Sequence, residues 1–263
     1  MHRNIYQETK ITELQQGCLF WGAIADGYDK PVWGLIITPR CDIAQNKVIT
    51  VHYLPVTKFT DWKDIHLAAM LQQDCIKKKL NTLKPVFDSK KISESLLDFK
   101  YRLSDEDLKT MFEGKKMPPN FFNDLREYWS YHDIQYCRDS FSSWKNYSNR
   151  ISELVEGKME RFLLLEHWND DLERYYVIHL TEIKHLQITT AHALIKGIKS
   201  NMVNEEDDLM YKNEGLKSQE YRVVAQITSP YIEYVCQKFA NAFFRIGIED
   251  WPNGHLSKDL QSL

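Results

Sequence analysis

The chain has 263 residues, 43% of them hydrophobic, enough for one large domain or for a small domain carrying a substantial insertion. Its formal net charge of -3 argues against an indiscriminate nucleic-acid binder, because such proteins are usually basic overall. No run approaches the roughly 18 apolar residues of a membrane span, and residues 1–8 hold no apolar signal-peptide core, so we expect a cytoplasmic protein that does not enter a membrane.

The first 60 residues are predicted to form a small antiparallel β unit. Apolar runs rich in β-forming residues cover 19–25, 32–38 and 48–54. Asp26 and Gly27 are a turn signal between the first two runs, and the connections are short. A meander of three strands is therefore the expected topology.

The middle of the chain is predicted to be helical. From about residue 61 the apolar residues recur at helical spacing, which predicts helices over 61–80, 104–114, 121–131 and 144–155. Ser104 and Asp107 have the spacing of a capping box at the start of the second helix. Aromatic residues are frequent in the last part of this block, namely Tyr128, Trp129, Tyr131, Tyr136, Phe141, Trp144 and Tyr147. Their spacing favours a helical core or a partner interface, with stacking on nucleic-acid bases as the alternative.

Strand patterns return after residue 157. Residues 162–168 and 175–180 predict a hairpin, 199–219 a mobile polar loop, and 221–227 a last strand. Ser229 as N-cap and Pro230 at the first helical position predict a C-terminal helix. The expected fold class is thus α+β. A β core formed by residues 1–60 and 157–263, with the C-terminal helix, is interrupted by a helical insertion over 61–156.

The N-terminal strands carry a further pattern. Gly17 leads the first strand, Lys30 and Pro31 open the second, which ends in residues 37–39, and the third ends in residues 54–57. This order resembles the opening of the MazF/PemK-type endoribonuclease toxins, over about the first 60 residues only. The resemblance implies a small antiparallel SH3-like β-barrel. In those toxins the arginine of an Arg-Pro pair and a later threonine help to cleave RNA by positioning and stabilising the phosphate.

The matching positions here are Lys30 and Thr57, so a lysine stands where the toxins have arginine. Lysine keeps the charge but lacks the planar fork that grips a phosphate with two hydrogen bonds. Arg40 would supply the missing guanidinium if the turn after Pro39 brought it across the same face. The middle helices and the C-terminal extension exceed the size of those compact toxins, which allows the barrel to be kept while the activity changes.

Arg40, Cys41 and Asp42 follow the second strand and have three interpretations. In the plainest, Asp42 closes the turn, Cys41 packs inward and Arg40 is solvated. In the second, Cys41 is a nucleophile, which requires a histidine partner. In the third, Arg40 binds an anion while Asp42 acts as a general base or metal anchor in phosphodiester chemistry.

Other patterns in the sequence give weaker evidence about a functional site. Arg126 and His132 have the loose arginine-to-histidine spacing of HEPN-type ribonucleases, which also arises by chance. The five cysteines form no CxxC pair and the nine histidines no HxxxH or HExxH pair. We therefore expect neither a metal nor a cofactor.

Two functions from different classes follow. The first is a non-catalytic interaction or regulatory component of a bacterial stress-response or phage-defence assembly. The second is an RNA-binding protein or endoribonuclease. Its catalytic residues would be Arg40, Asp42 and Thr57, and its substrate-binding residues Lys30, Lys77, Lys78 and Lys79. The net charge and the Lys30 departure favour the first function. We expect a protein partner, with RNA binding or a homo-oligomer as alternatives.

Overall fold

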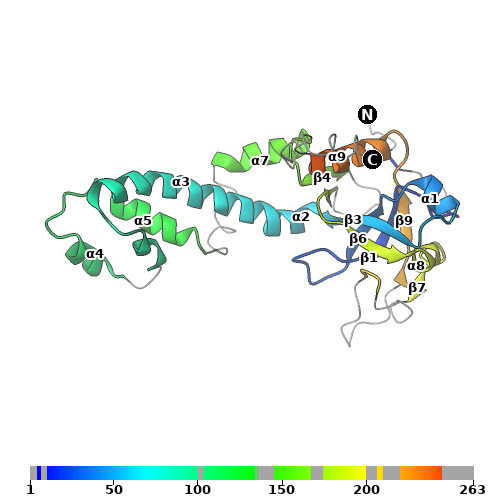
Figure 1. Cartoon of the computed structure of the whole chain (residues 1–263), viewed down its shortest axis with the longest axis horizontal. Helices are drawn as coiled ribbons and strands as arrows, with labels where there is room; N and C mark the ends of the chain where they lie inside the picture. Colours follow the sequence, from blue (N-terminus) through cyan, green and yellow to red (C-terminus); the bar gives the residue numbers. More distant parts are fainter. Residues whose placement is uncertain are drawn as a thin grey trace, which may run out of the picture. The chain divides into compact units, whose positions relative to one another are not determined.

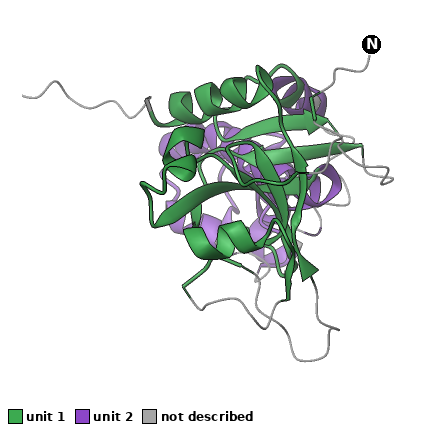
Figure 2. Cartoon of the chain, turned by 90° about the vertical axis from the view of Figure 1, so that its right-hand side faces the viewer, with its two compact units in different colours: residues 1–58, 154–263 green, residues 59–153 purple. Residues whose placement is uncertain are grey.

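The computed structural model describes residues 5–6, 11–99, 103–133, 135, 145–166, 174–199, 206–209 and 220–244. The chain divides into two compact units (Figure 2). Unit 1 comprises residues 1–58 and 154–263, and unit 2 comprises residues 59–153. The sequence patterns placed these boundaries at 60/61 and 156/157. The fold mixes helix and sheet, and every described strand belongs to unit 1.

Unit 1 is built on a curled antiparallel sheet of seven strands (Figure 1). The strands are β1 (Cys18–Ala23), β2 (Val32–Ile36), β3 (Thr50–Lys58), β4 (Phe162–Glu166), β5 (Tyr175–His179), β6 (Lys184–Gln187) and β9 (Val223–Gln226). Their spatial order is β4-β5-β3-β2-β1-β9, and β6 also pairs with β3. Strands β1 to β3 form the expected meander, and β4 pairs with β5 as the predicted hairpin requires. The sheet is thus assembled from both ends of the chain.

Each face of this sheet carries a buried hydrophobic cluster, and successive side chains of a strand alternate between the two faces. One face carries Leu19, Leu35 and Leu54 and packs against α9 (Tyr231–Phe244). The other face carries their neighbours in sequence, including Phe20, Ile36 and Tyr53, and packs against α8 (Ile188–Ala193). The side chains of β3 therefore alternate between two separate cores.

Several short elements of unit 1 carry no clear pattern in the sequence. They are α1 (Arg40–Ala44), α8, β6 and the small β7–β8 ladder (Ile198–Lys199 with Glu220–Tyr221). The α9 helix begins at Tyr231, one residue later than predicted, after a cis Ser229–Pro230 peptide. Its predicted end at 245–247 lies outside the described residues.

The acidic segment 206–209 lies outside helices and strands, as the loop predicted over 199–219 requires, but one of its acidic side chains does not face solvent. Asp207 is buried, and its carboxylate accepts hydrogen bonds from the Gln187 amide at 2.6 Å and from the Thr190 hydroxyl at 2.7 Å. The surface position predicted for Asp207 is wrong, because its carboxylate accepts hydrogen bonds from residues at the start of α8 rather than facing solvent. Residues 200–205 and 210–219 of the predicted loop lie outside the described residues.

Unit 2 is helical. Its elements are α2 (Phe59–Trp62), the π-helical turn η1 (Lys63–Leu67), α3 (Ala68–Lys90), the 3-10 turn η2 (Glu94–Asp98), α4 (Asp105–Met111), α5 (Phe121–Ser130) and most of α7 (Lys145–Val155). The helix predicted over 61–80 runs ten residues further, to Lys90. Within the described ranges, no helix combines the length and hydrophobicity needed to cross a membrane.

The core of unit 2 lies where α5 packs along α3. Leu83, Phe87, Phe121 and Leu125 are its central residues. Tyr128 and Trp129 are buried in the same cluster, as their helical spacing indicated, whereas Tyr136, Phe141 and Trp144 lie outside the described residues.

The capping box predicted at the start of α4 is confirmed. The Ser104 hydroxyl oxygen accepts a hydrogen bond from the Asp107 amide at 3.1 Å, and the Asp107 carboxylate accepts one from the Ser104 amide at 2.8 Å. Each side chain thereby satisfies a backbone amide that the first helical turn leaves without a partner.

Candidate functional site

The structure separates the site residues that the sequence grouped. In the pairing of β2 with β3, Trp33 lies opposite Val56 and Ile36 lies opposite Tyr53. Thr57 is therefore near the start of β2, whereas Arg40 follows the end of β2. The four residue steps along β2 alone span about 13 Å. The chain does not bring Arg40 and Asp42 to Thr57.

Arg40, Cys41 and Asp42 lie in the single turn of α1. Arg40 and Cys41 are exposed, Asp42 is partly buried, and the Cys41 thiol lies 3.5 Å from a carboxylate oxygen of Asp42. The residue of this turn that packs inward is Ile43, so the inward packing expected for Cys41 is wrong. Backbone hydrogen bonds close the turn, including that from the Asp42 amide to the Pro39 oxygen at 3.1 Å.

Thr57 lies in a buried chain of polar contacts. Its hydroxyl oxygen is 3.0 Å from Nε2 of His179, and the other ring nitrogen of His179 is 3.2 Å from a carboxylate oxygen of Glu182. The Tyr28 hydroxyl also donates a hydrogen bond to the Thr57 oxygen at 3.4 Å, and its ring meets the His179 ring at 5.8 Å. Lys30 is exposed in the loop that carries Tyr28.

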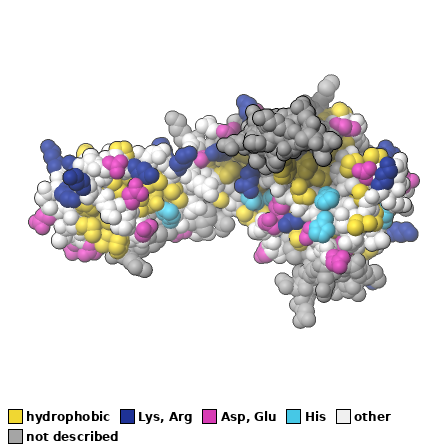
Figure 3. All heavy atoms as spheres, in the orientation of Figure 1, with side chains coloured by type: hydrophobic (Ala, Val, Ile, Leu, Met, Phe, Trp, Pro, Cys, Tyr) yellow, Lys and Arg dark blue, Asp and Glu magenta, His cyan; other side chains and the backbone are white. Residues whose placement is uncertain are grey.

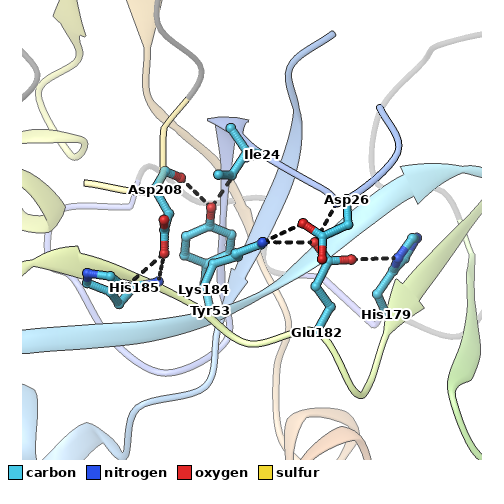
Figure 4. A network of polar contacts seen from close by, with 8 residues as sticks. All are labelled: Ile24, Asp26, Tyr53, His179, Glu182, Lys184, His185 and Asp208. Carbon is cyan, nitrogen blue, oxygen red and sulfur yellow. Dashed lines mark hydrogen bonds and ion pairs between the residues drawn. The ribbon is translucent and has the colours of Figure 1, made fainter. Parts of the chain in front are cut away.

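The chain of contacts continues to the β1–β2 loop (Figure 4). Glu182 accepts a hydrogen bond from the Asp26 amide at 2.7 Å, and the Lys184 ammonium lies 2.7 Å from the Asp26 carboxylate and 3.4 Å from that of Glu182. Burial alone would raise the pKa of Glu182, but the hydrogen bonds from His179 and the Asp26 amide outweigh it and lower the pKa. The network therefore ties the β1–β2 loop to the turn between β5 and β6.

The order Thr57, His179 and Glu182 matches that of a nucleophile, a base and a carboxylate that orients the base. Thr57 is 0% exposed and His179 is 2% exposed, however, and Tyr28 contacts the hydroxyl. A substrate does not reach an atom that is covered in this way. In this structure the hydrogen bonds among Thr57, His179 and Glu182 provide partners for polar side chains that are buried from water. The sequence signal for them is the spacing His179-x-x-Glu182 at the end of a predicted strand.

The opposite face of the sheet carries an open groove beside the same strand ends. We call it the tryptophan groove. It has a volume of about 510 Å³ and is lined by Trp21, Trp33, Lys58, Glu220, Arg222 and Val224. Its volume falls within the range of ligand-binding pockets.

Strand pairing places the two indoles of the groove together. Trp21 lies directly opposite Trp33 across β1 and β2, and their ring centroids are 4.6 Å apart at an interplanar angle of 60°. Trp33 in turn meets Tyr176 edge-to-face at 5.1 Å. Trp33 is only 8% exposed, whereas Trp21 is partly exposed. The sequence patterns gave no sign of this pair. Trp21 lies five residues before Asp26 and Trp33 six residues after Gly27, and a register shift between Trp21 and Ala23 brings the two indoles opposite each other.

The groove carries charge of both signs. Lys58 and Arg222 form no ion pair with any side chain of the described ranges, and Glu220 is the acidic residue of the lining. Acidic and basic side chains are interspersed over the face drawn in Figure 3. The groove thus offers local rather than general positive charge.

The other predicted residues lie in unit 2. Lys77 and Lys78 are exposed on α3, whereas Lys79 forms ion pairs with Asp124 at 2.7 Å and with Glu127. Burial would lower the pKa of Lys79, but these two carboxylates raise it. The ammonium group of Lys79 is therefore held by ion pairs within unit 2.

Two further predictions concern metals and the helical ribonuclease site. Arg126 lies within α5 and His132 beyond its end, where the imidazole meets the Tyr128 ring at 4.9 Å. Among the described residues, no three His, Cys, Asp or Glu side chains converge as metal ligands would.

No protein-family model, curated protein or solved structure matches this chain.

Proposed function

We propose that this protein is a non-catalytic recognition module, built on an SH3-like barrel, that binds an anionic partner in the tryptophan groove. The observation that carries the proposal is the pair of cations, Lys58 and Arg222, that line the groove without an ion pair in the described part of the chain. An anionic partner would supply the counter-charge, and indoles beside it would add apolar contact area.

The placement of the predicted catalytic residues supports a non-catalytic role. Thr57 is buried under Tyr28, and Arg40 and Asp42 lie beyond the other end of β2. General acid–base chemistry on RNA needs these groups within reach of one phosphate. The curled sheet and the β1–β3 meander support the SH3-like assignment. Membership of a stress-response or phage-defence assembly stays a prediction from the sequence.

Heparin-affinity chromatography with two matched double variants tests the binding surface. Lys58→Ala with Arg222→Ala removes the groove cations, and Lys47→Ala with Arg161→Ala removes the same charge from exposed positions elsewhere in unit 1. We expect the groove variant to elute at lower salt than the control variant, because local phosphate-like contacts are lost. Identical elution of the two variants would contradict the proposal.

A second assay tests the absence of catalysis. We expect purified protein to leave labelled single-stranded RNA intact with and without Mg²⁺ or Mn²⁺. Cleavage by the parent that disappears in Arg40→Ala, Asp42→Ala or Thr57→Ala would instead establish the endoribonuclease function.

A further inference from the structure

We infer that the partner held in the tryptophan groove is single-stranded nucleic acid, with a base stacked on Trp21 and phosphates at Lys58 and Arg222. This inference rests on the proposed function and names the ligand class of the same groove. It is drawn from the order of the lining residues across the sheet, their exposure and their charges.

The groove residues follow the strand order. Lys58 is on β3, Trp33 on β2 and Trp21 on β1, and Arg222 immediately precedes β9, where its carbonyl accepts a hydrogen bond from the Trp21 amide at 3.0 Å. A cation therefore lies at each end and the indoles lie between them. Three strand spacings amount to about 14 Å, which suits an extended strand crossing the sheet rather than one isolated phosphate.

The two indoles have different parts in this arrangement. Trp33 is wedged between Trp21 and Tyr176 by edge-to-face contacts at 4.6 and 5.1 Å, so it supports the neighbouring ring. Trp21 is the indole with the larger exposure and provides the stacking surface. Aromatic side chains held in this way bind unpaired bases of any sequence, because each base has a π-face.

Glu220 adds a hydrogen-bond acceptor to the lining of the groove. A base amino group can donate a hydrogen bond to such a carboxylate, which a ligand that offers negative charge alone cannot do. A double helix hides its base faces in the stack, so the groove selects single strands. The net charge of -3 likewise disfavours general duplex binding.

Fluorescence anisotropy with a labelled 12-nucleotide single strand tests the inference, using RNA and DNA of one sequence and the matching DNA duplex. We expect the single strands to bind and the duplex to bind at least about tenfold more weakly. Trp21→Ala should weaken single-strand binding about tenfold or more without changing the salt dependence. Lys58→Ala and Arg222→Ala should each lower the slope of log affinity against log salt by about 0.7.

Matched variants separate the groove from the rest of the surface. Lys47→Ala and Arg161→Ala remove the same residue types from exposed positions of unit 1 outside the groove and should bind as the parent does. Trp21→Phe keeps an aromatic platform and should restore most of the affinity lost in Trp21→Ala, which also excludes misfolding as the cause.

Three results would overturn the inference. They are unchanged binding by Trp21→Ala, equal affinity for duplex and single strand, and equal competition by a mononucleotide or by inorganic polyphosphate. If heparin retention still depends on Lys58 and Arg222 in those cases, the recognition function stands and only the ligand class fails. If the heparin result also fails, both proposals fall.

Discussion

Thr57 and Lys58 are neighbours in β3, yet their side chains serve opposite faces of the sheet. The Thr57 hydroxyl lies 3.0 Å from His179 inside a buried network, whereas Lys58 lines the tryptophan groove. Alternation along a strand makes this separation unavoidable. The threonine singled out by the toxin resemblance is therefore part of the interior, whereas the adjacent lysine lines the tryptophan groove.

Thr57→Val should destabilise unit 1. Valine keeps the shape of threonine but removes the oxygen that contacts His179 and Tyr28. Leaving buried polar partners without this contact costs about 1–3 kcal/mol of unfolding free energy. Urea denaturation of the purified variant measures this loss. Thr12→Val, at an exposed position of the same unit, should change stability far less. Equal stability of both variants would show that the buried contacts contribute nothing.

Glu182 should make the stability of unit 1 depend on pH in the acid range. Its pKa in the folded chain lies below the ordinary 4.5, because the hydrogen bonds from His179 and the Asp26 amide outweigh the effect of burial. A lowered folded pKa means that the carboxylate contributes stability above 4.5, and that this contribution is lost as pH falls through the folded pKa.

Glu182→Gln tests this dependence. The variant should be less stable than the parent at pH 7, and the difference should shrink as the pH falls below 4.5, since the parent then loses its carboxylate too. Urea titrations from pH 3 to 7 provide the measurement. Glu13→Gln, at an exposed site of the same unit, is the control. A pH-independent gap between variant and parent would contradict the role assigned to Glu182.

Local patterns predicted the regular elements better than the contacts between them. The β2 strand is a continuous apolar run, and the capping box of Ser104 and Asp107 marks the start of α4. Both elements can therefore be predicted from residues that are close in sequence. Strand β6 reads Lys-His-Leu-Gln and has no such run. It exists because β3 and the acidic segment 206–209 satisfy its backbone from elsewhere in the chain.

The candidate sites show the same limit. Thr57 and His179 are 122 residues apart, and no periodicity reveals that pairing. Arg40 was grouped with Thr57 to supply the guanidinium of the toxin resemblance, but the antiparallel pairing of β2 with β3 places Thr57 near the start of β2 and Arg40 beyond its end. The tryptophan pair could not be predicted from the turn either, because the pairing of β1 with β2 shifts its register between Trp21 and Ala23.

Cys41 should react with iodoacetamide before Cys18 does. Cys41 is exposed, whereas Cys18 is buried and burial raises the pKa of its thiol to about 11. Because the thiolate is the reactive form, Cys18 should be modified about 100-fold or more slowly than Cys41 at pH 8. Peptide mass spectrometry over a time course measures both rates. Comparable rates without denaturant would show that the N-terminal strands open readily.

Gly34→Ala should destabilise the centre of the sheet. A Cβ at this position would lie 2.3 Å from the Phe20 ring and 2.9 Å from Tyr53, closer than packed carbon atoms approach. Overpacking of a rigid core costs about 1–3 kcal/mol or more of unfolding free energy. Thermal denaturation should therefore show a lowered midpoint. Gly114→Ala is the comparison, since its Cβ would meet nothing within 4 Å and only its positive φ resists the change.

A double variant shows whether the Phe20 clash is the cause. Phe20→Leu removes the ring atoms nearest the new Cβ, so combining it with Gly34→Ala should cost less than the sum of the two single changes. An additive cost would place the strain of Gly34→Ala at Tyr53, which the new Cβ would still approach to 2.9 Å. A cost below the sum would show that the Phe20 ring, which meets Tyr53 edge-to-face at 5.1 Å, occupies the space that a Cβ at Gly34 would need.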